Sequence, residues 1–346
     1  ALPPPPPPPP LPPPPPTPPP SPPPSPPPNK CLALVGVIGA SFSGCNYLKL
    51  ADLSGAVLAR ANLDGANLVG AKLDGADLSH ASLRGADCTG ASFAHARMES
   101  VQLSRAILEH AYLGGAHLAS AELDGTRVGG ASFAAADLHE SLWHSVTSSL
   151  RSAPSSRGAA ALARQAGVRG VRFDGADLQA AAFTASKLPA ASFRNATMIG
   201  VHITDTDLRE ARFGGARFDS LSSIESSSLS GAQLEGAVLD GMSMVNLQLD
   251  HANLRAAQVR DALLVGSDMS EAVCDGADFS RSELTLCKFR GASLRQAVLR
   301  DAKLASASFH GADCEGANFL GATDIDTADF GNIVGTPIGL PKPPPP

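Results

Sequence analysis

A large apolar residue returns every five positions through most of this 346-residue sequence, and this period limits the possible folds more than any other feature. The first clear units run from Ala51 as ADLSG AVLAR ANLDG ANLVG AKLDG. Their central residues include Leu53, Leu58 and Leu63, and the residue two positions before each centre is small, usually alanine. A period of five fits neither the turn of an α-helix nor the alternation of a flat strand.

The period does fit a chain that turns a corner after every unit and points two side chains of each unit inward. Four such sides close a square coil of about 20 residues, and neighbouring coils pair about 4.8 Å apart as parallel β structure. The register runs to Trp143, resumes in phase at Val168 and, after a one-residue shift, continues from Leu229 to Phe319. The sequence therefore predicts about 12 stacked coils in a rod about 60 Å long.

The A(D/N)LxG pattern resembles that of the pentapeptide-repeat family between about residues 40 and 330. This resemblance implies an all-β protein, a right-handed quadrilateral parallel β-helix. Side chains four repeat units apart should then stack on one outer face, with Asp52 over Lys72 and Asp77 over Arg97. Such pairs contribute only about 0.2–1 kcal/mol each. Because both signs of charge are mixed along the repeat, we interpret the outer faces as solvated surface.

Composition divides the chain into six predicted segments. A polyproline II arm at 1–28 is followed by an N-terminal cap at 29–50, a first part of the β-helix at 51–143, an insertion at 144–166, a second part at 167–330 and a proline-rich tail at 331–346. Within the insertion, Ser155 or Ser156 could cap a short helix through Ala166. Two interpretations stay open: an excursion packed against Trp143, or a loop that binds a partner.

Residues 3–28 are nearly all proline, which fixes φ and lacks a backbone donor, so the arm is predicted to be a polyproline II rod. At about 3.1 Å per residue, this rod would extend roughly 80 Å. A stiff spacer is one interpretation. Serine followed by a short proline run also resembles extensin-type, hydroxyproline-rich glycoproteins, and that resemblance implies proline hydroxylation and O-glycosylation. The candidate positions are Pro18, Pro19, Pro20, Ser21, Pro22, Pro23, Pro24, Ser25, Pro26, Pro27 and Pro28.

The cysteines fall into two groups by their place in the repeat. Cys31 and Cys45 precede the regular units, and our preferred hypothesis is a disulfide between them that closes a short cap loop. The other four occupy inward positions, where a thiol serves as a small apolar filler: Cys88, Cys274, Cys287 and Cys314. A metal site would need Cys-x-x-Cys or clustered histidines, and the sequence has neither.

Motifs for chemistry are missing from the sequence. It contains no P-loop, HExxH or GxSxG, and the aspartates next to glycine are better interpreted as turn formers than as acid–base pairs. We therefore predict a non-enzymatic protein without a cofactor. The sequon Asn195-Ala-Thr197 is a candidate for N-glycosylation in a secreted chain.

Net charge and hydropathy limit the classes of partner that the chain can bind. A net charge of −6 excludes the strongly basic surface of a nucleic-acid binder. The sequence has no apolar run long enough to span a bilayer, so we predict no membrane span. The first residue, Ala1, suggests a mature protein from which a targeting peptide has been removed, and with the proline arm it favours an extracellular location.

Three functions are compatible with these features. We favour a structural subunit of an extracellular, glycosylated filament or wall assembly. Its β-helices would stack head to tail, because their ends are open edges and no amphipathic capping helix follows Phe330. In this hypothesis the proline rod contacts neighbouring copies. The alternative is a monomeric matrix or cell-wall binding module tethered by the proline spacer. A DNA mimic that binds topoisomerase, as in bacterial pentapeptide proteins, needs a strongly acidic surface, whereas 27 basic side chains here nearly balance 33 acidic ones.

Overall fold

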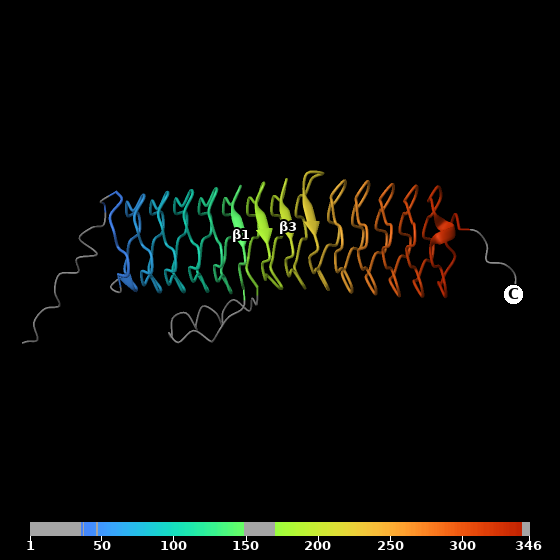
Figure 1. The fold of residues 1–346 in the computed structure, drawn as a ribbon, viewed down its shortest axis with the longest axis horizontal. Helices are drawn as coiled ribbons and strands as arrows, with labels where there is room; N and C mark the ends of the chain where they lie inside the picture. Colours follow the sequence, from blue (N-terminus) through green and yellow to red (C-terminus); the bar gives the residue numbers. More distant parts are fainter. Residues whose placement is uncertain (1–35, 37, 46–47, 149–169, 341–346) are drawn as a thin grey trace, which may run out of the picture.

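The computed structural model describes residues 36, 38–45, 48–148 and 170–340. These residues form a straight rod of stacked coils, from the blue N-terminal coils at one end to the red C-terminal coils at the other (Figure 1). Parallel bridges join each coil to the next along four sides, and no α-helix occurs within the described ranges. The predicted right-handed quadrilateral β-helix is thereby confirmed, while the predicted polyproline II arm lies outside the described residues.

Most bridges involve a single residue, but one side of the rod carries a four-stranded parallel sheet in chain order. Its register places Trp143 beside Phe183. A single turn of 3-10 helix, η3, follows near the C-terminal end of the described chain. The element bounds are β1 Leu142–His144, β2 Ala182–Thr184, β3 His202–Thr204, β4 Ser223–Glu225 and η3 Ile325–Thr327.

Bridged residues are normally one coil, or four repeat units, apart, as predicted for Asp52 with Lys72. Two steps differ. Ser132 pairs with Arg172, two coil lengths later, so the interruption of the repeat has the length of one coil and leaves the register intact. His202 pairs with Ser223 instead of with Ser222, which is the one-residue shift expected from the sequence.

The coil that precedes the interruption is longer than predicted. Thr147 forms bridges with both Arg127 and Lys187, and Ser148 is buried at a central position. The insertion therefore begins after Ser148 and not at residue 144. The predicted boundary was early because Ser148 does not resemble the large apolar residue that marks a centre. The predicted short helix lies outside the described residues.

Both ends of the β-helix also extend further than the regular motif. Ser41 pairs with Asn62, so part of the predicted cap at 29–50 is already a coil. At the other end Val334 and Ile338 still pair with the preceding coil, inside the predicted tail at 331–346. Side chains of unusual type or spacing conceal both terminal coils in the sequence.

The corners explain the consensus at the remaining positions of each unit. The amide of Ala56 donates to the carbonyl of Leu53 at 3.0 Å and closes a turn. Gly55 in this turn has φ +66°, a conformation that glycine adopts without strain. The amide just after a centre has no such partner, and an Asp or Asn just before the centre accepts its hydrogen bond, as Asp77 does from Ser79 at 3.0 Å.

The interior is a column of leucine with aromatic stretches. Phe133, Phe173 and Phe193 stack with ring centroids 5.4 and 4.9 Å apart. Trp143 lies across the coil from them, with its ring 5.2 Å from that of Phe133, and the residue is only 1% exposed. The large side chain of Trp143 and the small side chain of Ser148 occupy central positions of the same coil. Trp143 faces the core, and the insertion that was predicted to pack against it lies, beyond Ser148, outside the described residues.

Hydroxyl groups replace the usual turn bond at several corners. Ser186 occupies an alanine position, and its Oγ donates to the carbonyl of Trp143 at 2.9 Å. The same oxygen accepts from the amide of Val146 at 3.2 Å. This hydroxyl, from the next coil, thus stands between the two groups that bond directly in a regular corner. Both buried backbone groups are satisfied, so the open corner leaves neither of them without a hydrogen bond.

Candidate functional site

The C-terminal end of the rod is where its interior meets the surface. Phe319, one coil from the end, is fully buried. In the final coil, every inward apolar residue is only partly buried although it packs on the same core. These residues, which we call the open end, are Ala322, Ile325, Ala328, Phe330, Ile333 and Leu340.

The backbone of the open end is an unpaired β edge within the described chain. The amide of Phe309 donates to the carbonyl of Asp329 in the final coil at 2.7 Å. The equivalent amide in that coil, of Phe330, donates to no acceptor among residues 36–340 that the structure describes. Such an edge is a template for another strand.

Two residues of the open end were not predicted from the sequence. Ile333 and Leu340 fall in the segment interpreted as a tail. Ile333 lies one coil after Ala312, a buried small residue. The spacing between the two residues is one position longer than the length of a regular coil. A search that allowed one extra residue per coil, as already needed between Phe218 and Leu229, would have found it.

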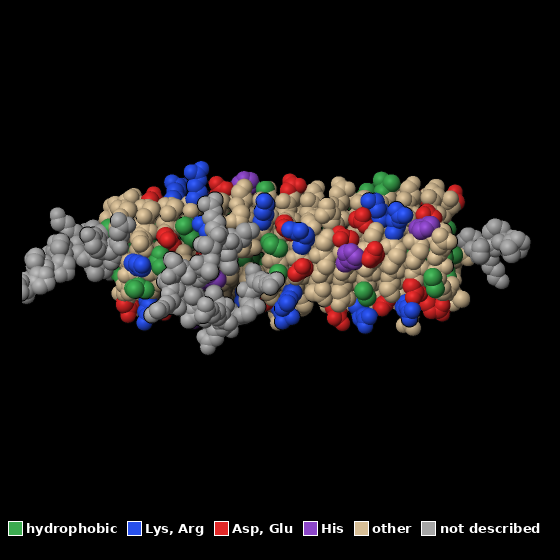
Figure 2. Space-filling model, turned by 90° about the horizontal axis from the view of Figure 1, so that it is seen from below, with side chains coloured by type: hydrophobic (Ala, Val, Ile, Leu, Met, Phe, Trp, Pro, Cys, Tyr) green, Lys and Arg blue, Asp and Glu red, His purple; other side chains and the backbone are tan. Residues whose placement is uncertain are grey.

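The sides of the rod carry both signs of charge. On the face shown in Figure 2, blue and red side chains are interspersed along the rod, without a field of one sign among the described residues. Bridged positions place opposite charges together, as for Arg97 and Asp77 at 4.0 Å. The predicted stacking of Asp77 under Arg97 is therefore confirmed.

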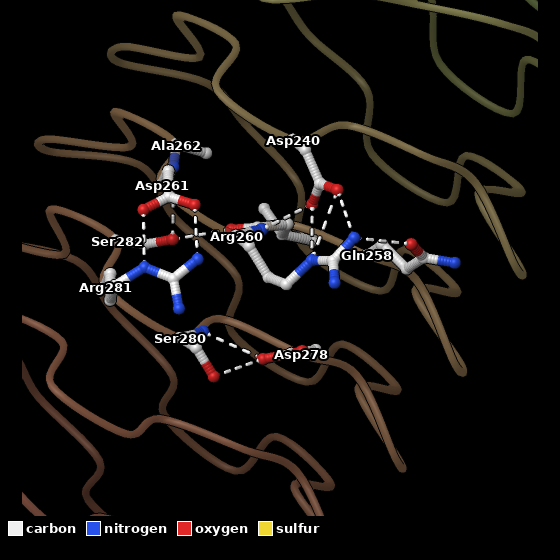
Figure 3. A network of polar contacts seen from close by, with 10 residues as sticks. Asp240, Gln258, Arg260, Asp261, Ala262, Asp278, Ser280, Arg281 and Ser282 are labelled. Atoms are coloured by element: carbon white, nitrogen blue, oxygen red, sulfur yellow. Dashed lines mark hydrogen bonds and ion pairs between the residues drawn. The ribbon is translucent and has the colours of Figure 1, made fainter.

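The most connected of these ladders lies on one corner of the C-terminal half (Figure 3). Arg281 bonds both carboxylate oxygens of Asp261, at 2.7 and 2.6 Å. This guanidinium lowers the pKa of Asp261. One coil earlier Arg260 approaches Asp240 to 2.5 Å in the same way. Each arginine is paired with an aspartate of the preceding coil, so this corner joins neighbouring coils.

The predicted modification sites fall partly within the described chain. Asn195 is exposed at a corner with φ +55°, and Thr197 is on the neighbouring ladder, so N-glycosylation stays a prediction at an accessible position. Cys45 is disulfide-bonded. Its predicted partner Cys31 and the candidate positions from Pro18 to Pro28 lie outside the described residues.

The remaining cysteines are core residues. All four are buried and reduced, as expected for fillers: Cys88, Cys274, Cys287 and Cys314. Burial raises the pKa of Cys274 to about 12, so this thiol is inert at neutral pH. Within the described ranges, no cluster of three or more His, Cys, Asp or Glu side chains could hold a metal ion.

The family model for pentapeptide repeats matches this chain in eight copies, within residues 38–109, 176–215 and 227–321. The chain belongs to the pentapeptide-repeat family. This match confirms the resemblance inferred from the A(D/N)LxG units. The extensin-like resemblance of the arm is a separate hypothesis. In this pentapeptide-repeat protein, no helix of the described residues is long and apolar enough to cross a membrane.

Solved structures with similarity to this pentapeptide-repeat protein include HetL from the cyanobacterium Nostoc sp. strain PCC 7120, a protein involved in heterocyst differentiation regulation. HetL is 21% identical, over 75% of this chain and 89% of its own, with a TM-score of 0.29. Full-length QnrB1, a plasmid-mediated fluoroquinolone resistance protein, is 19% identical over 72% and 92% of the two chains, with a TM-score of 0.29. A thylakoid-lumen protein of Arabidopsis thaliana is 24% identical over 30% and 68%, with a TM-score of 0.16. No curated protein matches the chain significantly.

Proposed function

We propose that this protein is a non-enzymatic structural subunit whose β-helices stack head to tail. The single observation that supports this proposal is the open end, where the core is exposed beside an unpaired β edge. A coil of a second copy would cover the apolar residues and accept the free amides at a spacing of about 4.8 Å, as between coils within one chain. A contact of this kind is heterologous, so repetition produces a filament.

The extracellular and glycosylated character belongs to the proposal as well. Its support is the extensin-like proline pattern and the exposed sequon at Asn195. In this hypothesis the proline arm contacts neighbouring subunits and the glycans cover the surface of the filament. The mixed charges along the sides favour a hydrated filament over a DNA mimic, because paired carboxylates present no continuous acidic field.

The test measures molecular mass against protein concentration by light scattering and sedimentation. We expect the mass of the unmodified protein to rise with concentration. Ile333→Lys places a charge in the open end and should keep the protein monomeric. Val334→Lys changes the neighbouring side chain, which points outward and is 60% exposed, and should assemble like the unmodified protein.

Circular dichroism of both variants establishes that the β-helix is retained. A protein that stays monomeric at high concentration would contradict the proposal. Equal assembly of the two lysine variants would show that copies associate through the sides of the rod instead of through the open end.

A further inference from the structure

A hollow of about 550 Å³ interrupts one side of the rod near the middle of the described chain. It is open to solvent along the surface, and a glycine is among the residues that line it. Its lining residues, which we call the arginine hollow, are Arg194, Arg212, Gly214, Gln233 and Glu235.

The hollow results from a missing side chain in a charge ladder. Arg194, Gly214 and Glu235 occupy equivalent positions, just after the centre, in three successive coils. The next two residues in this ladder, Arg255 and Asp275, form an ion pair at 3.1 Å. Because Gly214 has no side chain, Arg194 and Glu235 are instead held apart across the gap.

Both arginines of the hollow are uncompensated. Arg194 and Arg212 are exposed, and neither forms an ion pair or side-chain hydrogen bond with any described residue. The nearest acid in the preceding coil, Asp174, is already engaged: its carboxylate accepts from Arg172 at 3.0 Å and from the hydroxyl of Ser192. Two guanidinium groups therefore face the hollow with all their donors available.

The backbone adds donors to the same place. At several corners the amide just after a centre is accepted by an Asp or Asn before the centre, or by a carboxylate one coil earlier, as Asp74 accepts from Ala94 at 3.1 Å. At others, such as Gly129 and Ala134, this amide has no acceptor among the described residues. In the hollow, Arg212 and Gln233 stand at the first of these positions and cannot replace Asp or Asn in this turn. The amides of Gly214 and Glu235 consequently have no acceptor among the described residues.

Acceptors occupy the opposite side. The amide nitrogen of Asn253 lies 3.5 Å from both the Glu235 carboxylate and the Gln233 side-chain oxygen. A ligand across the hollow thus meets cationic donors at one edge and a carboxylate with two amides at the other. Bare phosphate would satisfy only the first edge and would be repelled by Glu235.

We propose that the arginine hollow binds the carboxylate of an acidic sugar unit within a polysaccharide. The carboxylate lies against Arg194 and Arg212 with the free backbone amides, and ring hydroxyls donate to Glu235 and Gln233. Charge-assisted pairs of this type are the strong polar contacts available to a shallow site. The open hollow suits a polymer whose chain continues past it, since enclosed small-molecule sites are mostly apolar.

The experiment titrates the full chain with an oligomer of four galacturonic acid units by calorimetry. The double variant Arg194→Gln/Arg212→Gln should weaken binding by roughly tenfold or more, the usual effect of removing charged hydrogen bonds. Gly214→Leu should do the same by filling the hollow, since a Cβ there meets no atom within 4 Å and the fold accepts it. Arg84→Gln changes an exposed arginine at the equivalent position of another side and should leave binding unchanged.

Three further ligands test the chemistry of the site. The methyl-esterified oligomer, which lacks charge, should lose binding, and inorganic phosphate and tetraglutamate should bind at least tenfold more weakly than the acidic sugar. No binding of the oligomer would overturn the proposal. Equal affinity for tetraglutamate would assign the hollow to acidic peptides, and an equal loss in Arg84→Gln would reduce it to general charge attraction. Subunit assembly through the open end is unaffected by any of these results.

Discussion

The coils that carry β1 to β4 differ from the regular coils at the N-terminal end, although both have the same five-residue repeat. In the regular coils alanine precedes each centre, and a direct backbone bond closes the corner, as between Ala61 and Leu58 at 3.0 Å. In the coils of the sheet, Ser186 and Thr206 take the alanine place, and their hydroxyls stand between the backbone groups of the coil before. In these coils the chain is also extended over three residues instead of one.

The difference shows that the interior and the corners are specified separately. Apolar centres of leucine size determine the square coil, and they are equally buried in both regions, as Leu63 and Phe183 illustrate. At some corners a hydroxyl from the next coil replaces the direct backbone bond, and this also occurs outside the sheet, where Ser282 stands between Ala262 and Val259. Both kinds of corner give the buried backbone amide and carbonyl a hydrogen-bond partner, which every buried corner requires.

The largest expected effect concerns the interior that both regions share. Leu254→Asp places an unpaired charge in the core and should cost about 3–5 kcal/mol or more, because no partner is available there. Coils on either side should lose amide protection together, since each is stabilised by its neighbours. Hydrogen exchange measures this loss. Leu263→Asp, at an outward position that is 41% exposed, is the matched control and should retain protection.

The second prediction concerns the open corners. Ser186→Ala removes the bridging hydroxyl and should destabilise the protein by about 1–3 kcal/mol, because the Trp143 carbonyl and the Val146 amide lose their partner. The denaturation midpoint gives the change. Ser132→Ala removes a hydroxyl without a partner among the described residues and should be nearly neutral. Equal midpoints for the two variants would mean that the open corner returns to the tight form at no cost.

The regular corners give a smaller effect. Asp87 accepts from the amide of Thr89 at 3.0 Å. The same oxygen accepts from the hydroxyl of Thr89 at 2.6 Å. Asp87→Ala should cost about 0.5–1.5 kcal/mol for each bond of this kind that is lost. Asp87→Asn keeps the acceptor and should behave like the unmodified protein, measured by the same midpoint. A loss with Asn as large as with Ala would show that the negative charge matters and not the hydrogen bond.

The smallest expected effect on stability is the loss of the Asp261–Arg281 ion pair at acidic pH. The hydrogen bonds from Arg281 lower the pKa of Asp261 below its ordinary value of 3.8. The contribution of Asp261 to the free energy of unfolding is therefore complete above about pH 4. It is lost as the pH falls through the lowered pKa that Asp261 has in the folded state. Because both side chains are more than half exposed, the loss is small. Hydrogen exchange at pH 7 and pH 2.5 should show a loss of amide protection near Asp261 at the lower pH. Protection near Ser186 should not fall in this way, because its hydrogen bonds involve no charged group.

Sequence alone predicted the coil because its signal is repeated many times, so an exception such as Ser148 does not obscure it. The outer stacking of Asp52 on Lys72 followed directly from the period. The hydroxyl corners could not be predicted, because serine and alanine are both small and only the carbonyl beside the hydroxyl distinguishes them. The arginine hollow was missed for a related reason. Its defining feature is the absence of a side chain at Gly214, which a repeat with many glycines conceals.

The double-length step in the ladder, where Ser132 pairs with Arg172, has a consequence for how this chain can change over time. An inserted segment as long as one coil of the β-helix leaves the register unchanged, so every later residue keeps its inward or outward orientation. Gain, loss or replacement of such a segment is then a local event. A new module could be acquired between Ser148 and Gly170 while the remainder of the protein continued to fold as before.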